Sequence, residues 1–278
     1  MLHLEVPGGG RKVLLHCCCA PCSGAVVECL VHNGIRPTLF FSNSNIAPRE
    51  EYDHRRSELE RYAALYGLPV VDDVYDHAAW MDFVVHGDAA LAAAPERGGR
   101  CLGCFKFRLL RAARYAAANG FDTLATTLAS SRWKSLGQVD EAGRWACGMQ
   151  DMDSSPNDKG AAHDPSAVGQ ADASANSTTS PAGQASSTPA AAGQAGSTTS
   201  AAGQAGTSAG STTSAAGPAD ASANSTTAAA GQAAPLVWWA QNWRKGGLQP
   251  RRAEIVREQN FYNQSYCGCE FSEHHETQ

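Results

Sequence analysis

Residues 12–34 read KVLLHCCCAPCSGAVVECLVHNG, and this stretch decides the expected fold. Residues 12–16 form a short aliphatic run that is typical of a buried strand. Residues 23–33 repeat their apolar side chains at helical spacing, and Gly34 follows as a C-terminal cap. Cysteines fill much of the loop between the two segments. The stretch therefore predicts a strand, a thiol-bearing loop and a helix.

The same alternation continues along the chain. Further strands are expected over residues 38–42, 69–71 and 121–127. Helices are expected from Pro48 to Tyr66, through Trp80 and Val84, and over residues 104–119. Strands that alternate with helices predict an α/β fold, in which a parallel sheet carries helices on both faces.

In a parallel sheet of this kind, ligands bind at the carboxyl edge of the strands. The loops that follow Leu15 and Phe41 are therefore expected to meet at one edge, which would bring the cysteines beside residues 43–45. The long helix after Pro48 is expected to turn its charged side chains toward water: Glu50, Arg55, Glu58 and Arg61.

One long segment has a different composition. No aromatic residue lies between Trp145 and Trp238, and no basic residue lies between Lys159 and Arg244. Such a segment has too little apolar area to offset the entropy of ordering it. We therefore expect an α/β core over residues 1–147, a disordered insertion over 148–234, and the C-terminal part of the same core over 235–278.

Charge and cysteine usage narrow the function classes. The formal net charge of −5 gives no global signature of nucleic-acid binding, so any RNA contact would need a local basic patch. The chain has ten cysteines, and those between Cys17 and Cys29 are too close for a disulfide framework, which favours metal or redox chemistry. No apolar run suits a secretion signal or a membrane span, so a cytoplasmic location without membrane contact is expected.

The first cysteine group comprises Cys17, Cys18, Cys19 and Cys22. Adjacent residues cannot all point into one core, and the start of the following helix favours thiolates. Cys29, on the apolar side of that helix, is instead expected to be a small buried hydrophobe.

The second group, Cys101 and Cys104, is by itself ambiguous between a metal knuckle and a redox pair. Two thiolates from each of the first two groups would complete the four that a [4Fe–4S] cluster or a structural zinc ion needs. Iron is favoured, because a closed zinc site would leave several other thiols without a purpose.

The third group is Cys267 and Cys269, separated by one glycine. A disulfide between residues two apart closes a very small ring and is easily reduced, which suits an exchangeable electron reserve. Two unreacted surface thiols, or a further metal knuckle, are the alternatives.

Together these motifs resemble the QueH family of epoxyqueuosine reductases. The matching segments are LHCCCAP (15–21), FSNSNI (41–46), YDHRR (52–56), CLGC (101–104), TTL (126–128), NWRKGG (242–247), QSYCGC (264–269) and FS (271–272). They cover nearly everything outside the expected insertion, in the same order. The resemblance implies an adenine-nucleotide hydrolase-like (HUP-type) fold, with the cysteine loop in place of a phosphate loop.

The resemblance also implies a ligand set. Cys18, Cys19, Cys101 and Cys104 would bind a [4Fe–4S] cluster, and Cys267 and Cys269 would form a redox-active disulfide. Cys17 and Cys22 are left to hold a second, mononuclear metal ion or to face the substrate. That substrate would be tRNA bearing epoxyqueuosine at the wobble position, with electrons from a donor that the sequence does not identify.

Reducing an epoxide to an alkene takes two electrons and two protons and expels water. A cluster usually passes electrons singly, so two sources, or two visits by a donor, are needed. A cluster iron or an adjacent metal could act as a Lewis acid on the epoxide oxygen. His16 is one candidate proton donor. The alternative is a strand-end histidine that orients the loop.

RNA contacts are expected from Trp243, Arg244 and Lys245 with Arg251 and Arg252, and from Arg132 and Lys134. The cations would pair with phosphates and the indole would stack on an anticodon base. A solvated basic surface is the alternative.

Two other functions compete. A tRNA thiolation enzyme of the ATP pyrophosphatase type would need a Ser-Gly-Gly-rich phosphate loop where this chain has cysteines. A zinc-stabilised RNA-binding module would not account for the C-terminal thiols.

Overall fold

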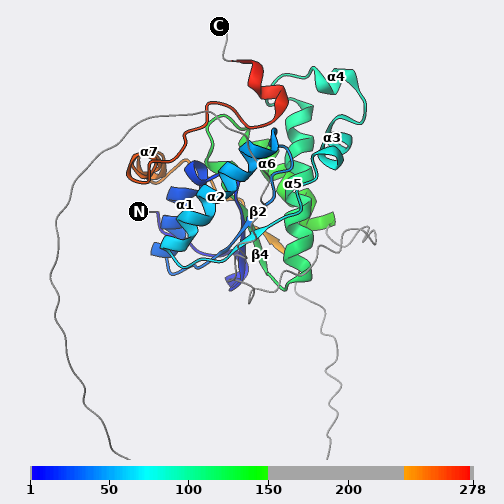
Figure 1. Ribbon diagram of the computed structural model, residues 1–278. Helices are drawn as coiled ribbons and strands as arrows, with labels where there is room; N and C mark the ends of the chain where they lie inside the picture. Colours follow the sequence, from blue (N-terminus) through cyan, green and yellow to red (C-terminus); the bar gives the residue numbers. More distant parts are fainter. Residues whose placement is uncertain (1, 150–234, 276–278) are drawn as a thin grey trace, which may run out of the picture. The chain divides into compact units, whose positions relative to one another are not determined.

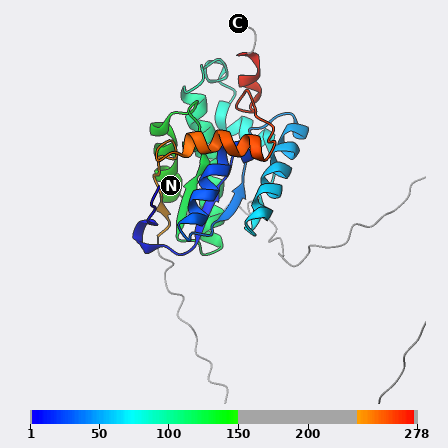
Figure 2. The same ribbon diagram turned by 90° about the vertical axis from the view of Figure 1, so that its left-hand side faces the viewer.

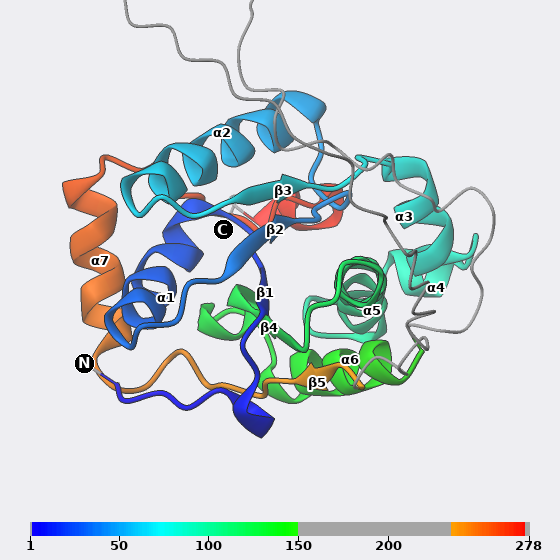
Figure 3. The ribbon, with the colours of Figure 1, turned by 90° about the horizontal axis from the view of Figure 1, so that it is seen from below.

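The computed structural model describes residues 2–149 and 235–275. Five parallel strands form one sheet in the order β3–β2–β1–β4–β5 (Figure 3). The strands are β1 (Val13–His16), β2 (Thr38–Phe41), β3 (Val70–Asp72), β4 (Thr123–Thr126) and β5 (Val237–Trp238). Apart from its first two residues, which end a helix, the expected insertion at 148–234 lies outside the described residues.

Helices cover both faces of the sheet (Figure 3). One face carries α1 (Ala20–His32), α2 (Arg49–Leu65) and α7 (Leu248–Glu258). The other carries α5 (Gly99–Ala118) and α6 (Leu136–Met149), with α3 (His77–Val85) and α4 (Ala89–Ala92) beyond α5. Three short 3₁₀ helices complete the structure: η1 (Pro7–Gly9), η2 (Thr127–Ser130) and η3 (Glu270–His275). This arrangement confirms the predicted α/β fold.

The core follows from the central position of β1. Its residues pair with β2 on one side and β4 on the other, so that Leu14 lies opposite both Thr38 and Leu124. Every residue of β1 and β4 is buried, as a strand covered on both faces requires. Figure 2 shows α7 lying across α1, which closes the outer side of that layer.

The last residues of several strands lie at the same edge of the sheet. His16, Phe41 and Thr126 end β1, β2 and β4, and parallel strands place those ends together. The C-terminal 3₁₀ helix η3, red in Figure 1, lies at this edge. Within residues 2–149 and 235–275, no helix has the length and apolarity that a membrane crossing needs.

Two sequence expectations need correction. Helix α5 begins at Gly99 and not at Cys104, so Cys101 lies inside the helix and not before it. Arg55 and Glu58 of α2 are buried, at 3% and 9% exposure, whereas they were expected to face water. The reason is the C-terminal segment: the backbone around Tyr262 and Cys267 packs over α2 and accepts or donates hydrogen bonds there.

Candidate active site

Two helix N-termini carry the first two cysteine groups. Cys19 is the N-cap of α1 and Cys22 is the third residue of that helix. Cys101 is the third residue of α5, and Cys104 follows one turn later. The partial positive charge at a helix N-terminus favours the thiolate form of a nearby cysteine. Both groups therefore occupy positions that suit metal-binding sulfur.

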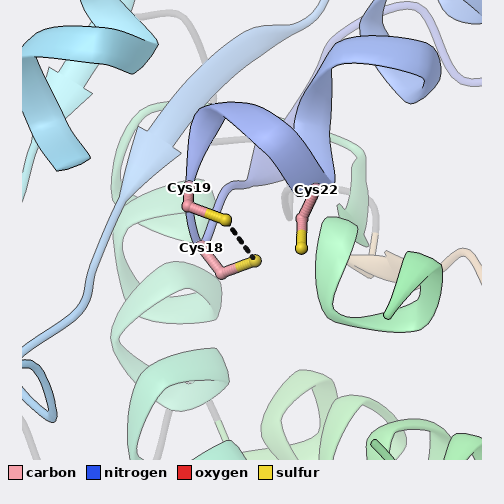
Figure 4. Close-up of side chains that lie close together, drawn as sticks. All are labelled: Cys18, Cys19 and Cys22. Carbon is pink, nitrogen blue, oxygen red and sulfur yellow. Dashed lines mark hydrogen bonds between the residues drawn. The ribbon is translucent and has the colours of Figure 1, made fainter. Parts of the chain in front are cut away.

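Three sulfurs of the first group converge. The Sγ atoms of Cys18, Cys19 and Cys22 all lie within 4.8 Å of one another, and Figure 4 shows them at the start of α1. The Sγ atoms of Cys18 and Cys19 are 3.9 Å apart. Hydrogen bonds from Cys19 and Cys22, assisted by nearby cations, hold the pKa of Cys18 well below its usual range, whereas hydrogen bonding to Cys18 raises the pKa of Cys22 to about 11. This trio has the donor set of a metal site.

Cys17 does not join the trio. Its Sγ atom donates to the carbonyl oxygen of Leu15 at 3.4 Å, and burial raises its thiol pKa. Its sulfur thus turns toward the backbone of its own strand and away from the other three. Cys29 is fully buried in the core, which confirms the expectation of a small hydrophobe.

Arg108 connects the second cysteine group to the first. It lies on α5 one turn after Cys104 and is only 1% exposed. Its Nε donates to the carbonyl oxygen of Ser42 at 3.2 Å, and a terminal nitrogen donates to Oδ1 of Asn43. Asn43 in turn donates to the carbonyl oxygen of Cys17 at 2.9 Å. One guanidinium thus fixes α5 against the loops that follow β1 and β2.

Lys134 connects the third group to the first. Its Nζ donates to Sγ of Cys267 at 3.4 Å. A hydrogen bond from Cys269, with the charges of Lys134 and Arg108, holds the pKa of Cys267 well below its usual range. Lys134 also interacts electrostatically with Cys18 and Cys22.

The C-terminal pair is held by helix α2 and its neighbours. Arg55 donates to the carbonyl oxygen of Cys267 at 3.1 Å, and the amide of Ala47 donates to the carbonyl oxygen of Gly268 at 2.9 Å. Gly268 has φ of +96°, a conformation that side chains disfavour. The glycine between the cysteines is therefore required by the backbone.

The second and third groups share one hollow. Cys101, Cys104, Cys267 and Cys269 line it together with Lys134. The amide of Arg97 donates to Sγ of Cys101 at 3.3 Å. The second and third cysteine groups therefore line one hollow, and the first group is linked to it through the charges of Lys134 and Arg108.

His16 occupies the end of β1 and is fully buried. Its Nε2 lies 3.1 Å from the carbonyl oxygen of Ser42, so Nε2 carries the proton, and Nδ1 accepts from the hydroxyl of Thr126 at 2.8 Å. Burial, and then the charge of Arg108, lower the pKa of His16 to about 3. A ring with both nitrogens engaged in hydrogen bonds fits the loop-orienting alternative.

The residues expected to contact RNA differ in their exposure and in their partners. Trp243 is 1% exposed and donates to the carbonyl oxygen of Thr126 at 3.0 Å, so it has no open face for a base. Arg244 binds the carbonyl oxygens of Ser131 and Lys134. Arg251 is ion-paired with Glu28, Glu254 and Glu258. Arg132 and Lys245 are exposed.

Comparison with known proteins identifies the family. The sequence model of the family described as "Epoxyqueuosine reductase QueH" matches residues 13–158 and 194–275. The chain is 30% identical over 269 residues to the protein named epoxyqueuosine reductase QueH from Histophilus somni, a match that covers 97% of this chain and 75% of the relative. The relative of the same name from Haemophilus influenzae is 29% identical, with coverage of 97% and 74%. The relative from Acinetobacter baylyi is also 29% identical, with coverage of 98% and 84%. The chain therefore belongs to the QueH family of epoxyqueuosine reductases, which are oxidoreductases.

Proposed function

We propose that this chain reduces epoxyqueuosine to queuosine at the wobble position of tRNA, with a [4Fe–4S] cluster and the Cys267–Cys269 pair as its redox groups. The family membership supports the reaction and the RNA substrate. The arrangement of thiols and buried cations supports the redox groups.

The observation that carries the proposal is the charge of Arg108. Within residues 2–149 and 235–275 this buried guanidinium donates to Ser42 and Asn43 but forms no ion pair with a carboxylate. A buried cation without a counter-charge is costly. Its charge acts instead on the thiols of Cys18, Cys104 and Cys267. A site that holds several thiolates, or an anionic cluster bound to them, supplies the compensating negative charge.

The donor set fits a cluster. Cys18 and Cys19 from the loop after β1, with Cys101 and Cys104 from α5, would hold it, since four thiolates are the usual ligands of a [4Fe–4S] centre. When bound, the cluster would supply electrons one at a time. Cys22 is a further sulfur beside Cys18 and Cys19, and it would be one of the ligands of a second, mononuclear metal ion.

The chain's own residues balance the reaction. Oxidation of the Cys267 thiolate and the Cys269 thiol to a disulfide releases two electrons and one proton. Lys134, within hydrogen-bond distance of Cys267, would give the second proton. Two electrons and two protons convert the epoxide to an alkene and release its oxygen as water. An external electron donor must then reopen the disulfide before the next turnover.

Nucleoside analysis of the tRNA tests the proposal. Substrate tRNA isolated from cells that lack epoxyqueuosine reduction would be incubated anaerobically with the reconstituted chain and a chemical reductant, then digested and analysed by mass spectrometry. The native chain should convert epoxyqueuosine to queuosine, Cys267→Ser should not, and Cys29→Ala should act like the native chain, because Cys29 lies in the core. Unchanged epoxyqueuosine with a fully loaded native chain would contradict the proposed reaction.

A further inference from the structure

The loop between η2 and α6 presents an indole at the mouth of the hollow. Trp133 is 62% exposed and also lines the hollow that holds the cysteines. Three other large apolar side chains are described as exposed, Leu65, Val74 and Tyr262, and none of them lines it. A single exposed apolar side chain needs no explanation. An exposed tryptophan at the entrance to a reaction site differs, because a ligand that enters the site must pass it.

Two arginines immobilise this loop. Arg97 donates to the carbonyl oxygen of Trp133 at 2.9 Å and to that of Arg132 at 3.2 Å. Arg244 donates to the carbonyl oxygens of Ser131 and Lys134. Four consecutive carbonyl groups are thus held by two guanidinium groups, one from each side of the expected insertion. These hydrogen bonds hold the backbone of the loop although its indole is exposed, and an aromatic side chain on a held backbone binds with little loss of conformational entropy.

The surroundings of the indole suit a nucleic-acid base. The guanidinium of Arg132 lies over the ring of Trp133 at 4.7 Å from its centroid, in a cation–π arrangement. Arg132 is itself exposed, so its charge is available to a phosphate next to a stacked base. The neighbouring residue, Lys134, points inward to Cys267. In this short loop, Lys134 therefore faces the reaction site, and Trp133 faces the entering ligand.

We propose that Trp133 is the stacking platform for an unpaired nucleobase of the RNA substrate, adjacent to the nucleoside that enters the hollow. This inference rests on the proposed function, from which the RNA substrate comes. It moves the stacking role from the buried Trp243 to an exposed indole 110 residues earlier in the chain. Aromatic stacking tolerates any base, so Trp133 would contribute affinity more than base identity.

Binding and turnover of an anticodon stem-loop RNA test the proposal with the full-length, cluster-loaded chain under anaerobic conditions. Trp133→Ala should raise the Kd about 5- to 160-fold, the equivalent of the ~1–3 kcal/mol that stacking contributes per base. It should raise KM with little change in kcat, and the iron content should not change. Trp133→Phe, which keeps an aromatic ring, should recover most of the affinity.

The matched control is Leu65→Ala. Leu65 is 60% exposed, but it ends α2 at the opposite edge of the sheet, so its removal should leave RNA binding unchanged.

A Kd that is equal for Trp133→Ala and the native chain would overturn the proposal. If such a variant also lost turnover only when a protein electron donor replaced a chemical reductant, Trp133 would belong to a protein-docking surface instead. A native chain that binds the RNA without reducing it would contradict the proposed reaction. The Kd values of the native chain and Trp133→Ala would still test the stacking proposal. A native chain that fails to bind the RNA would overturn the stacking proposal.

Discussion

Replacing Gly268 with alanine should uncouple the C-terminal cysteines from the rest of the site. Gly268 has φ of +96°, and an added Cβ would lie 2.8 Å from a terminal nitrogen of Arg55 and 3.1 Å from Cγ1 of Ile46. Arg55 is buried and also binds the carbonyl oxygen of Cys267, so it cannot move aside without losing that hydrogen bond. The substitution therefore strains the backbone and displaces the guanidinium that holds the loop.

The magnitude follows from these two effects. A left-handed conformation costs a residue with a side chain about 1–2 kcal/mol. Loss of a charged hydrogen bond in a buried place costs about 1.5–3 kcal/mol. The native position of the loop should thus be destabilised by roughly 3 kcal/mol, which corresponds to a shift of about 100-fold in its population.

Turnover with a chemical reductant, measured beside iron content, is the assay. Gly268→Ala should lose about 10- to 100-fold in turnover while its iron content stays native, because no cluster ligand is moved. Gly120→Ala is the matched control: its φ is +66°, and an added Cβ would have no neighbour within 4 Å. That variant bears the backbone strain alone, after α5 and far from the hollow, and should keep native turnover. Native turnover by Gly268→Ala would refute the reasoning.

Three further substitutions test other contacts. Arg108→Met should lower both the iron content and the midpoint of thermal unfolding, since the thiols lose their buried cation, and Arg108→Lys should restore part of the iron; native iron content in the Met variant would contradict the charge argument. Lys134→Met should keep the iron but slow single-turnover reduction about 100-fold or more, because Cys267 loses the ammonium beside it and the reaction loses a proton donor; unchanged rates would remove Lys134 from the chemistry. Glu58→Gln should weaken the acceptor for the amide of Tyr262 by about 1 kcal/mol, and hydrogen exchange of that amide should become faster; equal protection in both chains would show that this contact does not hold the C-terminal segment.

The sheet and its carboxyl edge could be predicted from local pattern alone. The run at residues 12–16 is aliphatic because β1 is covered on both faces. A buried strand of this kind can be recognised from the sequence alone. Helix α7 and strand β5 were not predicted. Strand β5 has only two residues, and α7 buries just Leu248 and Ile255 against its neighbours, so neither leaves a periodic pattern.

The site was predicted less completely than the sheet. Cysteine spacing predicted three groups of thiols, but it could not separate Cys17, whose Sγ donates to the carbonyl oxygen of Leu15, from its three neighbours. The exposure of a charged or aromatic side chain depends on segments distant in sequence. Arg55 is buried by a C-terminal loop more than 200 residues away, and Trp243 is buried against β4. Arg108 had no signal of its own, because only the fold places it among the thiols.

Iron and acid-labile sulfide analysis after anaerobic purification tests the central claim most directly. The native chain should contain about four irons and four sulfides, the composition of a [4Fe–4S] centre, and its visible absorbance should bleach with dithionite. Cys101→Ala and Cys104→Ala should lose the iron, whereas Cys29→Ala should keep it. A colourless native chain with one tightly bound zinc ion would contradict the account.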